Sequence, residues 1–240
     1  HEYSQKLENY KADLNRRIQE IQHENQMHRL RTSLFFDHQR NAFAGILAKI
    51  AEVNQKWIDE AYVEEEGLTE SVPYEAYKEL QNTFYQHQLF LDSSCRAAME
   101  LVFDYYRDTF PGLDSVQNSL EIEAAYKSIE YLQPRLTELF QGKIGVTVSG
   151  HGEREIALLG SIRLLNELNF SEIKLSDEDP LKLRRRDHAS DAVANAEENY
   201  HYLVSKLKQC KNFLDQEGGF FYRETTKIKR YLEMLSVEKK

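Results

Sequence analysis

The chain has 240 residues, of which 41% are hydrophobic, and a formal net charge of −9. That length suits one large domain, or one domain with an appendage, and lets a sizeable core form without disulfides or metals. The negative charge argues against broad contact with nucleic-acid phosphates, which basic surfaces serve. Only 4 Pro and 10 Gly interrupt a composition rich in helix-forming residues. These features predict an all-α protein.

Four further features bear on location. The chain contains no run of 18 apolar residues, so it has no predicted transmembrane segment, and no signal peptide is visible. Cys95 and Cys210 both fall among apolar helix positions, which favours buried thiols in a reducing compartment over a disulfide. The chain starts at His1 without an initiator Met, so we expect a fragment or a tag remnant. The predicted location is cytoplasmic, with membrane attachment only through a segment outside this chain.

Residues 1–33 have a helical but polar pattern. Their apolar residues fit a heptad seam, with Ile18 just beside it: Tyr3, Leu7, Tyr10, Leu14 and Ile21. The other seam positions, where apolar residues belong, are occupied by Arg17, Glu24 and His28. This pattern predicts a marginal coiled coil or a helix laid on a neighbour. We therefore expect self-association, or binding of a protein partner, through Leu7, Tyr10, Leu14 and Ile21.

The stretch from Leu34 to Tyr62 predicts the helix around which the fold is organised. Apart from adjacent pairs, its apolar residues recur at steps of three, four and seven: Phe36, Phe43, Ile46, Leu47, Ile50, Val53, Trp57, Ile58, Ala61 and Tyr62. A continuous helix from Tyr3 to Val63 would be about 90 Å long, twice the roughly 45 Å diameter of a compact chain of this size. Residues 1–30 would then project as a stalk, unless the helix breaks at Thr32-Ser33. The sequence leaves both possibilities open.

The remaining chain predicts five more helices. The first runs from Pro73 to about Asp108, and the second from Asp114 or Ser115, through Pro134, to a glycine-rich loop at 142–152. A short helix over 156–168 follows, then a long helix that ends near Gln216, and a last helix around Ile228–Leu235. Gly67 suits a left-handed position after the first helix. The expected architecture is thus a bundle of about six helices over residues 34–240, preceded by a polar extension over 1–33.

Two patterns hint at chemistry. Gly145 and Gly150 have the spacing of a phosphate-binding loop, but His151 and Gly152 replace its Lys and hydroxyl residue, and a helix precedes it. A plain connection between helices is the favoured interpretation. Glu20-x-x-His23 and Glu198-x-x-His201 are pairs of the kind that di-metal helical bundles use. Both pairs lie on polar or flanking helix positions, so surface histidines are favoured over a metal site.

The densest basic run is Arg184-Arg185-Arg186, with Lys182 beside it. On a helix, such a cluster could bind phosphates or an anionic membrane surface. Ion pairs with the acidic run at 177–179 are the favoured alternative. If the run binds an anion instead, Arg184, Arg185 and Arg186 are the candidate residues.

One resemblance concerns the first quarter of the chain. Tyr10-Lys11-x-x-Leu14 lies in a charged helix, and Arg40-x-x-Phe43-x-x-Ile46-Leu47 then opens an apolar bundle. This order resembles uncharacterised bacterial proteins in which a charged helical stalk, often after a membrane anchor, leads into a helical domain. The resemblance implies no activity and no site residues.

The sequence favours a non-catalytic interaction or assembly module with no predicted cofactor, and the soluble part of a larger or membrane-anchored protein is one form that such a module takes. No nucleophile elbow occurs, and both cysteines fit structural positions. The alternatives are a metal- or nucleotide-dependent enzyme and an anion-binding helical module.

Overall fold

The computed structural model describes residues 2–65, 67–111, 119–146, 150–168, 173–184, 186–217 and 221–236; side chains at 2–10, 12 and 13 lie outside this description. The fold is all-α, as predicted, with eight α-helices among the described residues. They are α1 (Glu2–Glu60), α2 (Tyr74–His87), α3 (Ser93–Arg107), α4 (Ser119–Lys143), α5 (His151–Glu167), α6 (Ala189–Glu198), α7 (Tyr200–Gln216) and α8 (Tyr222–Ser236). A small antiparallel hairpin, β1 (Val63–Glu64) and β2 (Gly67–Leu68), follows α1.

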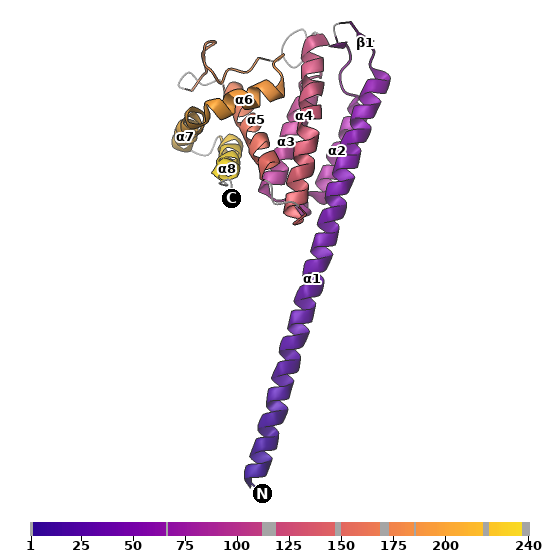
Figure 1. Ribbon diagram of the computed structural model, residues 1–240, viewed down its shortest axis with the longest axis vertical. Coiled ribbons are helices and arrows are strands. Elements are labelled where there is room, and N and C mark those ends of the chain that lie inside the picture. The colour runs from indigo at the N-terminus through magenta and orange to yellow at the C-terminus, as the bar shows by residue number, and fades with distance from the viewer. Residues whose placement is uncertain are drawn as a thin grey trace.

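Helix α1 is continuous, which answers the question left open at Thr32-Ser33. The Thr32 hydroxyl donates to the carbonyl of His28 within the same helix, at 2.9 Å, so these residues do not end it. At 1.5 Å per residue, α1 is about 90 Å long. Figure 1 shows its first part projecting far beyond the other helices. We call residues 2–38 the stalk, because Gln39 is the first buried residue among the side chains of α1 that the structure describes.

The upper part of α1 supplies one wall of the core. Phe43 stacks on Phe140 of α4, with ring centroids 4.3 Å apart. Trp57 is completely buried, and its indole nitrogen donates to the carbonyl of Glu70 at 2.8 Å. Its ring also lies against Tyr106 of α3 and Tyr126 of α4. The predicted stripe is thus confirmed over its middle, whereas Phe36, Ile58 and Tyr62 are exposed.

The second half of the fold is built around α5, which is buried on most of its sides. Helices α4, α6 and α8 pack directly against it, and α7 packs against α8. Gly160 of α5 is the closest approach to α8: a methyl group there would overlap the ring of Tyr231. Tyr231 is itself buried. Gly160 is therefore needed because no larger residue leaves room for that ring.

We expect Gly160→Ala to lower the free energy of unfolding by about 1–3 kcal/mol, the usual cost of overpacking a core. Gly150→Ala is the matched control, since nothing lies within 4 Å of the added methyl group and its φ is −88°. Urea unfolding of both variants checks this. Equal stability of the two variants would contradict the close packing of α5 against α8.

The two helices beyond the expected six arise from two breaks. The helix predicted from Pro73 to Asp108 divides at a 3₁₀ turn, Gln88–Phe90, after which Asp92 caps α3 by accepting from the backbone N–H of Cys95 at 2.8 Å. The long helix ending at Gln216 divides at Asn199, whose φ of −103° and ψ of 27° are not helical. Pro134 causes no such division, and α4 continues through it.

Two smaller expectations have clear outcomes. The first helix ends at Glu60, earlier than predicted, because the chain turns there into the hairpin; Gly67 has the expected left-handed backbone, with φ of 118°. Cys95 and Cys210 are free and buried. Burial raises the pKa of both thiols, that of Cys210 to about 11, so neither is a reactive thiolate near neutral pH.

Candidate functional site

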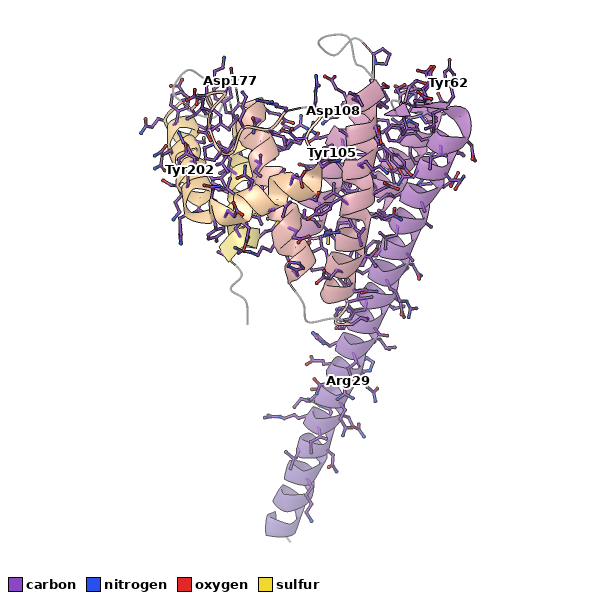
Figure 2. All side chains as sticks on the ribbon, turned by 45° about the horizontal axis from the view of Figure 1, so that its top comes forward. Arg29, Tyr62, Tyr105, Asp108, Asp177 and Tyr202 are labelled. Atoms are coloured by element: carbon purple, nitrogen blue, oxygen red, sulfur yellow. The ribbon has the colours of Figure 1, made fainter. Side chains whose placement is uncertain are left out.

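The stalk is a long surface that the bundle leaves uncovered over most of its length. Every side chain from Leu14 to His38 is exposed. Figure 2 shows the side chains of the lower stalk, with Arg29 labelled, extending away from the helix on its several sides, whereas Phe35 and His38 lie against Phe90. Of the predicted interaction residues, Leu14 is 44% and Ile21 is 57% exposed, and both contact no other helix. Leu7 and Tyr10 lie in α1, but their side chains fall outside the described ones.

The exposed apolar residues of the stalk continue the core-facing side of α1. Buried Gln39, Phe43, Ile46, Ile50, Val53 and Trp57 follow one another at steps of three or four. Extending the same steps downward defines the stalk stripe: Leu14, Ile18, Ile21, Asn25, His28, Thr32 and Phe35. This line differs from the predicted seam, which passed through Arg17 and Glu24 and left Ile18 aside. The stalk stripe therefore faces the same side as the bundle, but below it.

The stalk also has a second, shorter apolar group on its opposite side. Met27, Leu30 and Leu34 are all exposed, and Leu30 is separated from Ile21 by nine residues, which is two and a half helical turns. Around this group lie charged residues such as Arg31 and Asp37. The stalk stripe is longer and connects with the core, so it is the stronger candidate surface.

The basic run does not lie on a helix, which corrects the predicted helix-borne cluster. Arg184 and Arg186 are exposed in the connection before α6, and Arg185 lies outside the described residues. The backbone N–H of Arg184 donates to the carboxylate of Asp187 at 2.7 Å.

Arg186 lines a pocket of about 210 Å³ together with Lys182, His188, Asp187 and Asp191. Two carboxylates thus balance the two permanent cations at this pocket. Of the predicted ion pairs with the acidic run, the structure contains the long contact of Lys182 with Asp177, at 4.0 Å. The balance of charge gives the pocket no strong preference for an anion.

The two Glu-x-x-His pairs do not converge. Glu20 and His23 lie on the stalk, whereas Glu198 and His201 flank the break between α6 and α7, at the other end of the molecule (Figure 1). Within the described ranges, no group of three or more His, Cys, Asp or Glu side chains is placed to hold a metal ion. The glycine-rich segment connects α4 with α5, with 147–149 outside the described residues.

One polar cluster was not predicted from the sequence. The carboxylate of Glu155 in α5 accepts from Tyr131 at 2.9 Å and from Arg135 at 2.5 Å, both in α4, and contacts His151 at 3.0 Å. Burial, and then the bond to Glu155, raise the pKa of Tyr131 to about 12. The cluster borders a pocket of about 290 Å³ between α4, α5 and α6. Because the carboxylate is fully satisfied within the protein, it serves mainly to join α4 to α5.

No family model, no curated protein and no solved structure matches this chain. No helix in the described part of the chain is both long and apolar enough to cross a membrane. The surface of the molecule is therefore the remaining guide to function, and the stalk stripe is its most distinctive feature.

Proposed function

We propose that this protein is a helical assembly module whose stalk stripe binds a second copy of the chain. The observation that carries the proposal is the exposed apolar group of Leu14, Ile18 and Ile21, which lies on the same side of α1 as the core residues, beyond the polar residues Asn25, His28 and Thr32. A surface helix usually derives its stability from packing of its apolar side. A contiguous exposed apolar surface on a protein marks an interaction site.

A second copy is the occupant that the stalk itself suggests. The stripe begins with three apolar residues, Leu14, Ile18 and Ile21, and continues with Asn25, His28 and Thr32. Apolar seam residues together with a few polar ones are typical of a helix that packs on a second helix. Glu24 and Arg17 lie directly beside the stripe, so residues of opposite charge line the rim of such a pair. In this assembly the stalk forms the contact between the two copies, and the bundle is the domain attached to it.

The test uses two substitutions of the same kind on opposite sides of the stalk. Ile21 and Leu30 are 57% and 58% exposed, so in the isolated chain each tolerates an Asp equally well. In a symmetric dimer, Ile21→Asp removes two buried side chains, a loss of about 3 kcal/mol or more, which raises the dissociation constant about 100-fold. Sedimentation equilibrium at micromolar concentrations measures this change.

Leu30→Asp, the matched control, should leave the dissociation constant within a few-fold of that of the unchanged protein. A protein that is monomeric at all concentrations would contradict the proposal. So would dissociation by Leu30→Asp with no effect of Ile21→Asp, because the opposite side of the stalk would then form the contact.

A further inference from the structure

We infer that the two copies pair antiparallel, with Ile18 of each copy facing Ile21 of the other, so that the bundles lie at opposite ends of the assembly. The inference rests on the proposed function and adds the orientation and the register. It follows from where the stalk stripe points. The stripe shares its side with Phe43, and Phe140 of α4 lies directly against Phe43 at 4.3 Å.

A parallel pair on this surface is sterically blocked. In a parallel pair, the second α1 would run upward along the same side and reach the level of Gln39, where the 3₁₀ turn Gln88–Phe90 and the C-terminal end of α4 lie. Gln39 donates to the carbonyl of Phe90 at 3.0 Å, and Phe35 lies against the Phe90 ring at 5.7 Å, so this space is filled. Figure 1 shows α1 along one edge of the bundle and the stalk continuing past it. Since α1 is unbroken, the second helix cannot turn aside.

An antiparallel pair avoids this collision, because the second bundle lies beyond the far end of the overlap. In such pairs, seam residues at three- and four-residue steps alternate between the helices. Pairing Ile18 with Ile21 of the second copy places four isoleucines at the two-fold axis. The same register sets Leu14 opposite Asn25. It also brings Arg17 near Glu24 of the second copy, twice by symmetry, which adds attraction at the rim.

Disulfide cross-linking tests both orientation and register. The native thiols, Cys95 and Cys210, are buried and do not interfere. The double variant Leu14→Cys/Asn25→Cys is oxidised in a glutathione buffer and analysed by non-reducing electrophoresis. The two new thiols cannot join within one chain, because eleven residues of helix separate them by about 16 Å. We expect the main band to shift from monomer to covalent dimer in the double variant, and in neither single variant.

His23→Cys/Leu30→Cys, on the opposite side of the stalk, is the control and should remain a monomer on the gel. Covalent dimers from both single variants would overturn the inference, since only a parallel pair brings residue 14 to residue 14 and residue 25 to residue 25 of the second copy. So would a protein that is dimeric in solution but does not cross-link through positions 14 and 25. A protein that sediments as a monomer instead refutes the proposed function itself.

Discussion

Replacing Trp57 with Ala should lower the free energy of unfolding by about 3–5 kcal/mol, the usual cost of removing a fully buried aromatic side chain. Trp57 is completely buried and joins α1 to α3 and α4 through Tyr106 and Tyr126. Its indole also donates to the carbonyl of Glu70, which fixes the segment between the hairpin and α2. Urea unfolding followed by circular dichroism measures the change.

Trp57→Phe separates the two contributions. It keeps an aromatic ring in the core but leaves the Glu70 carbonyl without its donor, so we expect a smaller loss than with Ala. Ile58→Ala, one residue along on the exposed side, should change stability by less than about 1 kcal/mol. If Trp57→Ala were as mild as Ile58→Ala, the stripe of α1 would not form the core as described.

Asp104→Ala should have an effect of similar size for an electrostatic reason. Asp104 of α3 and Lys227 of α8 are both buried, and the Lys227 Nζ lies 3.3 Å from an Oδ of Asp104. Arg107 also pairs with this carboxylate. Removing Asp104 leaves the Lys227 charge buried without its counter-ion, which typically costs about 3–5 kcal/mol. Thermal or urea unfolding reports the loss.

Two variants test that explanation. Asp215→Ala breaks the exposed pair with Lys211 and should cost less than about 1 kcal/mol. Asp104→Leu/Lys227→Met removes both buried charges and should recover most of the stability lost in Asp104→Ala. If the double variant were no more stable than Asp104→Ala, the loss would come from packing and not from an isolated charge.

The pH dependence of Asp104→Ala provides a second check. Burial already lowers the pKa of Lys227 from its ordinary value of 10.5, and loss of the carboxylate lowers it further. The unfolded chain then binds more protons than the folded one between the lowered pKa and 10.5. The free energy of unfolding of the variant should therefore rise with pH across that window.

The sequence predicts a helix well where its apolar residues recur on one side and that side becomes buried. The burial of Phe43, Ile46, Ile50, Val53 and Trp57 follows from three- and four-residue steps alone. The break before α3 could not be predicted in this way, because Gln88, Leu89 and Phe90 are compatible with a helix. It depends on the cap that Asp92 provides and on contact of Phe90 with His38 and Phe35 of α1, which is a tertiary effect.

The candidate surface was predicted only in part, for a related reason. The heptad pattern identifies Leu14 and Ile21 as seam residues. Which side of the helix the apolar stripe follows, however, depends on α1 being unbroken and on the side of α1 that faces α4. Only the buried residues above Gln39 fix that direction, and they place Ile18 and Asn25 on the stripe. The Glu155 cluster was missed because Tyr131, Arg135 and His151 come from two helices that no local pattern relates.

The uninterrupted α1 also has a mechanical consequence. One rigid rod extends from the free stalk into the centre of the fold, so the stalk acts as a lever whose fulcrum lies near Gln39. Leu14 is about 38 Å from that point along the helix axis, and a sideways displacement of about 5 Å there corresponds to a rotation of roughly 8°. Because no hinge within α1 absorbs this rotation, it reaches the rings of Phe43 and Trp57 directly. A force applied to the stalk is thereby delivered to the best-packed side chains of the molecule.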